Sequence, residues 1–81
     1  MKEPDLRNLV IGALTEVAPE IDTEKLDPDV SFRDQYPLDS VDFLNFVLKL
    51  EQGLRMSVPQ ADYPQLSSLQ GCLQYFSLHQ P

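Results

Sequence analysis

The chain has 81 residues and a mass of 9.2 kDa, which is enough for one small hydrophobic core and too little for a second. Hydrophobic residues make up 42% of the sequence and charged residues 23%, a balance typical of a globular domain. Thirteen acidic and six basic side chains give a net charge of -7, which argues against a nucleic acid or an anionic membrane as partner. We therefore expect one globular domain over residues 1–81 that binds neither.

Few residues could support catalysis, metal binding or export. Cys72 is the only cysteine and His79 the only histidine, which excludes an internal disulfide and the usual metal pairs, and we expect Cys72 to be an inert core residue. Asp27, Asp29 and Ser31 have the spacing of the first ligands of a calcium loop, but the glycine and glutamate that such a loop needs further on are missing. The sequence has no glycine-rich phosphate loop and no apolar leader segment. We therefore expect a cytoplasmic protein that is not an enzyme and binds no metal.

Apolar residues recur every three to four positions early in the chain and predict a helix over residues 4 to 18. They are Leu6, Leu9, Val10, Ala13, Leu14 and Val17. Pro4 fits the first turn, and Pro19 disfavours helical geometry at the residue before it. Residues 19 to 39 lack this period and predict a long loop that is packed down by irregularly spaced apolar anchors. These anchors are Ile21, Leu26, Val30, Phe32 and Leu38.

A second helix is predicted over residues 40 to 54, with Asp39 as N-cap, Asp42 three positions on in a box-like arrangement, and Gly53 near its end. One face of this helix carries a first set of apolar residues, namely Val41, Leu44, Val47, Leu48 and Leu54. A second stripe consists of Phe43, Phe46 and Leu50. The second stripe is either covered by the rest of the domain or exposed to a partner.

The end of the chain predicts one short and one longer helical segment. After Val58-Pro59, a helical turn over residues 61 to 64 is expected to end at Pro64. A last helix begins after Ser67 or Ser68 as N-cap and ends near Leu78. Its apolar positions are Leu69, Cys72, Leu73 and Phe76. The predicted fold class is all-α: a small antiparallel four-helix bundle with three main helices, one short helix and a long first loop.

Ser40 carries the most specific chemistry in the sequence, because it places a hydroxyl group at the exposed amino end of a helix, directly after a loop. A phosphoester at this position would face unpaired backbone N–H groups and the positive end of the helix dipole. An Asp-Ser pair before a helix is also typical of ordinary capping. The pair by itself leaves both interpretations open.

The surroundings of Ser40 resemble those of acyl carrier proteins, and the resemblance covers nearly the whole chain. In that family, a loop with a phenylalanine and an acid leads into a Gly-x-Asp-Ser-Leu signature, an Ile-Pro pair follows the second helix, and hydroxyl residues with an aliphatic begin the last helix. The similar segments here are residues 32–41 with Leu38-Asp39-Ser40-Val41, then Val58-Pro59, then Ser67-Ser68-Leu69. The resemblance implies a four-helix bundle of acyl-carrier-protein type.

The resemblance also implies a function. Ser40 would carry 4'-phosphopantetheine, placed there from coenzyme A by a phosphopantetheinyl transferase, and the arm would hold acyl groups as thioesters. The domain would act as a monomer and serve the acyl-activating or acyl-transferring enzymes of its pathway. The side chains expected to meet these partners are Asp39, Val41, Leu44, Phe46 and Glu51.

Two departures from the family pattern suggest what kind of carrier this is. Pro37 stands in place of the usual glycine, and its fixed φ, with an extended backbone at Tyr36, would stiffen the approach to Ser40. The helix over residues 40 to 54 has only Asp42 and Glu51 as acids, whereas carriers of fatty acid synthesis have several glutamates there. We therefore predict a carrier for a specialised pathway, whose partners depend more on apolar contacts such as Phe46 than on charge steering.

The alternative hypothesis is an acidic helical interaction module that is never modified and binds a partner through Phe43 and Phe46. Under the carrier hypothesis, Ser40→Ala abolishes loading and leaves the bundle folded. Under the interaction hypothesis, Ser40→Ala has no effect and Phe46→Ala weakens binding. A stand-alone enzyme ranks below both, because the sequence lacks acid, base and metal constellations.

Overall fold

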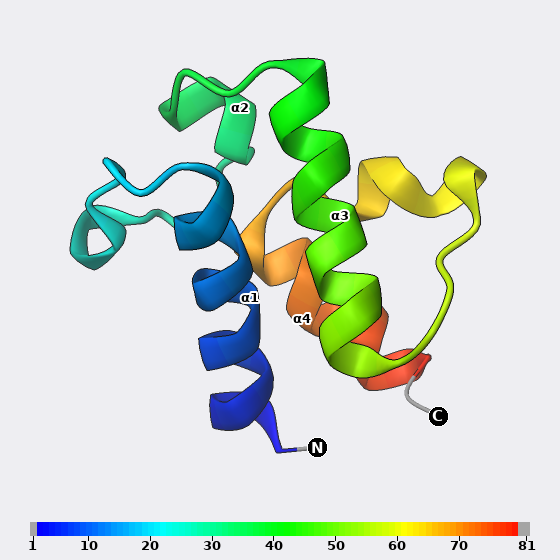
Figure 1. The fold of residues 1–81 in the computed structure, drawn as a ribbon. Helices are drawn as coiled ribbons and strands as arrows, with labels where there is room; N and C mark the ends of the chain where they lie inside the picture. The colour runs from blue at the N-terminus through cyan, green and yellow to red at the C-terminus, as the bar shows by residue number, and fades with distance from the viewer. Residues whose placement is uncertain (1, 80–81) are drawn as a thin grey trace.

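The computed structural model describes residues 2–79, and its regular elements are helical (Figure 1). The α-helices are α1 (Glu3–Val17), α2 (Phe32–Gln35), α3 (Ser40–Leu54) and α4 (Leu69–Leu78). Two 3-10 helices, η1 (Thr23–Lys25) and η2 (Gln60–Leu66), lie in the connections. Between residues 2 and 79 no β-strand is present. The predicted all-α fold class is confirmed.

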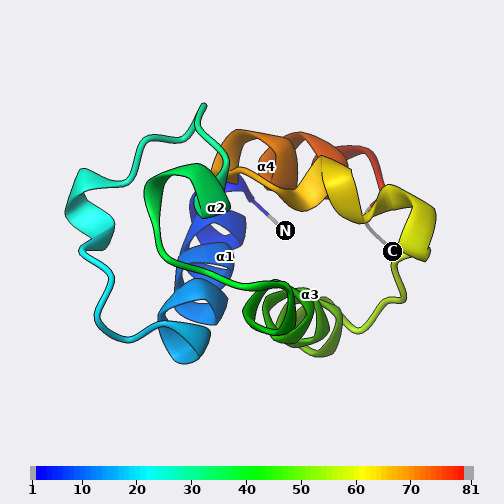
Figure 2. The same cartoon turned by 90° about the horizontal axis from the view of Figure 1, so that it is seen from above.

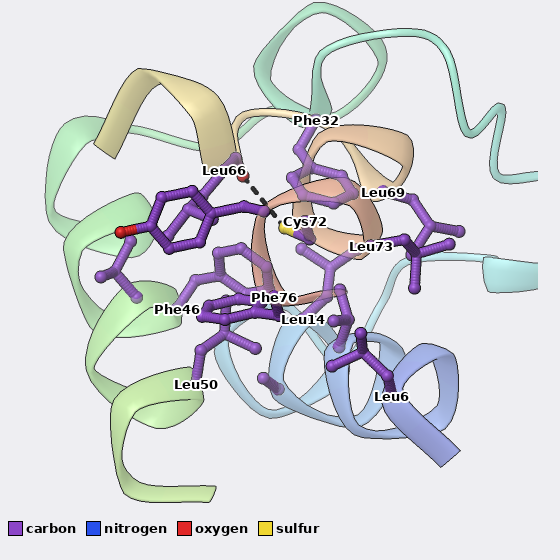
Figure 3. Close-up of a cluster of buried hydrophobic side chains, with 14 of the residues drawn as sticks. Leu6, Leu14, Phe32, Phe46, Leu50, Leu66, Leu69, Cys72, Leu73 and Phe76 are labelled. Atoms are coloured by element: carbon purple, nitrogen blue, oxygen red, sulfur yellow. Dashed lines mark hydrogen bonds between the residues drawn. The ribbon is translucent and has the colours of Figure 1, made fainter. Parts of the chain in front are cut away.

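The three longer helices enclose one core. α1 and α3 run side by side in opposite directions, α4 packs against α1, and η2 packs against α4 (Figures 1 and 2). Each long helix turns an apolar stripe inward, and the side chains that fill the centre have no exposed surface (Figure 3). They include Leu6, Val10 and Leu14 from α1, Phe46, Val47 and Leu50 from α3, and Leu69, Cys72 and Phe76 from α4. This burial is the main stabilising contribution to so small a domain.

α1 begins and ends within one residue of the predicted bounds. Glu3 and Asp5 place negative charge in its first turn, where the helix dipole favours it. Ala18 leaves the helical region, with φ -146° and ψ 75°, because Pro19 follows it. The apolar positions predicted for this helix are all buried or half-buried.

The segment predicted as a long loop contains η1 and α2, which the sequence pattern did not indicate. Gln35 fastens the segment: its Nε2 donates to the carbonyls of Asp27 and Val30 at 2.9 Å each, and its Oε1 accepts the N–H of Asp27 at 3.0 Å. The predicted apolar anchors pack as expected, with Leu26, Phe32 and Leu38 buried and Ile21 and Val30 half-buried. The loop is therefore a packed part of the domain.

α3 has the predicted bounds, but its end is formed differently from the prediction. Gly53 is still helical, and the left-handed residue that terminates the helix is Arg55, with φ 55° and ψ 44°. Gly53 instead lies where α1 comes close, because a Cβ atom there would stand 2.9 Å from Cδ1 of Leu9. The glycine thus serves the contact between α1 and α3 rather than the cap.

The prediction that Pro64 ends the short helical turn was wrong. η2 runs through Pro64 to Leu66, and the carbonyl of Pro64 accepts the N–H of Ser67 at 3.4 Å. Pro64 removes only one N–H donor from a short surface helix, and this loss is tolerated there. α4 then begins with Ser68 as its N-cap, since Oγ of Ser68 accepts the N–H of Gly71 at 3.0 Å, and it ends at Leu78 as predicted.

Candidate functional site

Ser40 is the first residue of α3, and its side chain is exposed. The chain reaches it through a tight turn at Pro37, where the N–H of Leu38 donates to the carbonyl of Tyr36 at 2.8 Å. Tyr36 has an extended backbone, with φ -134° and ψ 152°, as predicted for a residue before proline. Its hydroxyl group donates to the carbonyl of Asp22 at 3.2 Å, and burial, followed by the Asp22 carboxylate, raises the pKa of Tyr36. Leu38 is buried, so the approach to Ser40 is held from both sides of Pro37.

A capping box fixes the start of α3. Oδ1 of Asp39 accepts the N–H of Asp42 at 2.8 Å, and Oδ2 of Asp42 accepts the N–H of Asp39 at 3.3 Å. Among residues 2–79, the N–H groups of Ser40 and Val41 have no acceptor. These two donors and the positive end of the helix dipole would favour an anionic phosphoester on the serine.

The start of α3 also rests on the packed loop. The ring of Phe32 meets that of Phe46 edge to face, with centroids 5.2 Å apart. The N–H of Phe32 donates to the carbonyl of Ser67 at 2.7 Å, and the N–H of Gln70 donates to the carbonyl of Pro28 at 2.9 Å. These contacts join the packed loop both to α3, the helix that begins with Ser40, and to the start of α4.

An apolar stripe lies on the exposed side of α3 beside Ser40. Val41, Leu44 and Leu48 expose 64%, 45% and 42% of their surface. Leu44 and Leu48 follow Ser40 at intervals of four residues, so they form one ridge with it along the helix. We call Val41, Leu44 and Leu48 the α3 stripe. An exposed apolar group of this kind is typical of a contact surface for other proteins.

Three residues that the sequence suggested for partner contacts have internal roles. Phe46 has 0% exposure, so the expectation that it presents apolar surface to a partner was wrong. Phe43 is half-buried against it, with ring centroids 6.2 Å apart. Glu51 is half-buried, and its Oε2 accepts the N–H of Val58 at 2.8 Å, which holds the connection after α3. Asp39, Val41 and Leu44 are exposed close to Ser40.

Sequence reasoning placed Leu48 among the apolar residues of the helix but not among the residues expected to meet partners, and it did not single out Gln35. The signal for Leu48 was its position eight residues after Ser40, on the same ridge as Leu44. Gln35 carries no local signal, because its three bonds reach back five and eight residues to backbone groups in an irregular segment.

The acidic groups considered for metal binding and the thiol of Cys72 make contacts within the fold. In the described part of the chain, no group of three or more His, Cys, Asp or Glu residues could hold a metal ion. The Asp27 carboxylate accepts the N–H of Asp29 at 3.0 Å. Cys72 donates its thiol hydrogen to the carbonyl of Leu66 at 3.4 Å, and burial raises the pKa of this thiol. The helices seen between residues 2 and 79 include none with the length and apolar character needed to cross a bilayer.

Comparisons with known proteins agree with this geometry. Residues 6–76 match the family model described as "Phosphopantetheine attachment site". The chain is 28% identical over 80 residues to an acyl carrier protein of Lactobacillus johnsonii, covering 99% of both chains. It is 25% identical over 60 residues to an acyl carrier protein of Rubrobacter xylanophilus, covering 74% of both.

Proposed function

The chain belongs to the phosphopantetheine attachment-site family of acyl carrier proteins, and from this premise we propose that Ser40 is the residue that bears the arm. Members of this family are non-catalytic carriers that a phosphopantetheinyl transferase modifies and that pathway enzymes then use. The observation that carries the assignment is the exposed hydroxyl of Ser40 at the capped amino end of α3, beside two N–H donors that have no acceptor within residues 2–79.

The modification transfers the phosphopantetheinyl group of coenzyme A to the serine. Oγ of Ser40 attacks the phosphorus that bears the pantetheine, the phosphoanhydride bond breaks, and adenosine 3',5'-bisphosphate leaves. The hydroxyl proton passes to a base of the transferase. This chain supplies the exposed hydroxyl, and the N–H groups of Ser40 and Val41 stabilise the phosphodiester that results. The arm's thiol then takes an acyl group as a thioester, and its tether raises the effective concentration of cargo at client enzymes.

We propose that partners dock on the α3 stripe and Asp39. Val41 and Leu44 flank the proposed attachment point, and covering their exposed apolar surface would stabilise a complex with a partner. Phe46, which the sequence suggested for partner contacts, is left out of this proposed surface because it is buried. The same burial weakens the alternative of an unmodified interaction module, which needed an exposed Phe43 and Phe46 stripe.

A dedicated pathway other than bulk fatty acid synthesis remains part of the proposal. The support comes from the two acids of α3, since Asp42 is engaged in the capping box and Glu51 binds the N–H of Val58. Lys49 on the same helix pairs with Glu16 of α1 at 3.5 Å. Because the charged groups of Asp42, Glu51 and Lys49 bind other groups of this chain, we propose that partner recognition depends on the apolar α3 stripe. We propose that the protein is a monomer and acts in the cytoplasm, where coenzyme A is available.

The test is the intact mass of the protein after incubation with coenzyme A, magnesium and a broad-specificity phosphopantetheinyl transferase. We expect one phosphopantetheinyl increment on the wild type and on Ser77→Ala, which changes an exposed serine of α4, and none on Ser40→Ala. Circular dichroism should show Ser40→Ala to be folded. An increment that persists in Ser40→Ala would move the attachment point. No increment on the wild type with several transferases would favour the unmodified interaction module.

A further inference from the structure

The interior of the domain is widest between α3 and α4. The backbone of α1 approaches those of both α3 and α4 closely, whereas α3 and α4 have few backbone contacts with each other. Figure 2 shows this space between α3 and α4, with η2 at one end. Side chains must therefore fill it, and which ones do so determines whether anything else can enter.

Aromatic rings occupy this space. Phe46 reaches in from α3 and Phe76 from α4, and Leu66 of η2 closes it; all three have 0% exposure (Figure 3). Phe32 packs edge to face on Phe46, and the ring of Phe43 lies 6.2 Å from the same ring, measured between centroids. An alkyl chain that entered this space would have to displace aromatic rings that are already packed against their neighbours.

Three surface hollows lie elsewhere, along α1. One of about 410 Å³ lies between α1 and α4 and is lined by Glu3, Leu73 and Leu78 among others. Two of about 370 Å³ and 270 Å³ lie between α1 and α3 and share Glu16 and Lys49. All three are open to solvent, and none is lined by Ser40, Phe43 or Phe46.

We propose that the acyl cargo of this carrier stays outside the bundle, and that Phe46 is the residue that excludes it from the interior. The inference rests on the proposed function, because it concerns the group attached through Ser40. Phe43 and Phe46 stand three and six residues along α3 from Ser40, so their rings fill the part of the core that an acyl chain attached to Ser40 would reach first. The matching cargo is a short or polar acyl group, since such a group has few methylene groups that burial would stabilise.

The experiment compares carriers loaded with an acetyl and an octanoyl group, each transferred with its pantetheine arm from the acyl-coenzyme A and verified by mass. The rate of thioester cleavage by hydroxylamine is measured in buffer and in denaturant, which gives the intrinsic reactivity. Because a chain left in water gains no protection, we expect the two normalised rates to agree within about twofold. The melting temperature should also be the same for both forms. An octanoyl form cleaved about tenfold more slowly, with a raised melting temperature, would overturn the proposal.

Substitution of the ring tests the role of Phe46 itself. Phe46→Ala should leave an apolar cavity that an alkyl chain can fill, so that octanoyl cleavage becomes several-fold slower than acetyl cleavage. Phe46→Leu is the milder variant to use if the alanine variant does not fold. Gln52→Ala, an exposed change on the same helix, should keep the ratio of the wild type. A folded Phe46 variant without protection would remove Phe46 as the excluding residue. Absence of loading would refute the proposed function and this inference together, whereas loading with protection refutes only the inference.

Discussion

The capping box of Asp39 and Asp42 holds Ser40 at the end of α3, and its removal should have a measurable cost. Asp39→Ala deletes the acceptor of the 2.8 Å bond from the N–H of Asp42 and leaves the first turn with one donor fewer satisfied. The loss of such an N-cap lowers the free energy of unfolding by about 1 kcal/mol. Asp39→Asn keeps an acceptor and loses only the charge near the helix dipole, which contributes about 0.3 to 1 kcal/mol. For a domain of this size, 1 kcal/mol corresponds to a melting temperature lower by roughly 4 to 8 °C.

The assay is urea and thermal unfolding followed by circular dichroism, with Ser40→Ala as the control. The expected order of stability is wild type, then Asp39→Asn, then Asp39→Ala. Ser40→Ala should stay within about 0.5 kcal/mol of the wild type, because the hydroxyl is exposed and makes no side-chain bond among the described residues. An Asp39→Ala protein as stable as the wild type, or an Asn variant as unstable as the Ala variant, would refute the reasoning. A transferase rate that falls in Asp39→Asn at unchanged stability would report a direct contact of the carboxylate with the enzyme.

Three further predictions concern the fold. Gly12→Ala should raise the free energy of unfolding by about 0.5 to 1 kcal/mol, because the added methyl group meets open space on a helix. Gly71→Ala should lower the free energy of unfolding, because the added methyl group would overlap the backbone carbonyl of Gln65. Urea unfolding of both variants tests this contrast. Gln35→Glu keeps the side-chain shape but loses two N–H donations to loop carbonyls, and should lower the free energy of unfolding by roughly 1 to 3 kcal/mol; equal stability would contradict the role of Gln35. Burial raises the pKa of the Cys72 thiol above its ordinary 9.0, so the folded protein keeps a proton that the unfolded chain releases. Stability is therefore full below pH 9 and falls as the pH rises above it, and this fall should be absent from Cys72→Ala in unfolding measured from pH 7 to 10.

The long helices could be predicted because their signals are local. α3 starts at Asp39-Ser40 and α1 stops before Pro19 for reasons that involve only a few neighbouring residues. The position of Ser40 at a helix start was predictable for the same reason. Where a signal has more than one use, the prediction failed: Gly53 can end a helix or admit a neighbour, and the approach of Leu9 decides for the second. That approach depends on a segment more than forty residues away.

The short helices and the exposed face of α3 depend on contacts that no local pattern reveals. α2 is held by the bond between Phe32 and Ser67 and by the side chain of Gln35. The apolar residues of α3 form an arc too wide for one buried stripe, and periodicity does not say which part of it the other helices cover. The packing of Phe32 and α4 against Phe46 settles the question and leaves the α3 stripe in solvent. The helix start that carries Ser40 was thus predictable, while the surface expected to meet partners had to be corrected at Phe46.

The proposed location of the cargo has a consequence for recognition. With the acyl group outside the bundle, a partner enzyme meets the domain through the α3 stripe, whatever the cargo. Leu44→Ser should then lower kcat/KM for modification by roughly fivefold, since covering the exposed part of a leucine contributes about 1 kcal/mol. The factor should be the same with coenzyme A, acetyl-coenzyme A and octanoyl-coenzyme A as donors, and Gln52→Ala should leave the rates unchanged. Because more than half of Leu44 is already covered within the domain, Leu44→Ser should also lower the free energy of unfolding by roughly 1 kcal/mol. The rates are therefore compared at a temperature at which circular dichroism shows both proteins to be folded, which separates a lost contact from a lost fold. An unchanged rate in Leu44→Ser would remove the α3 stripe as the docking surface, and a factor that grows with the acyl chain would show that cargo and domain surface are read together.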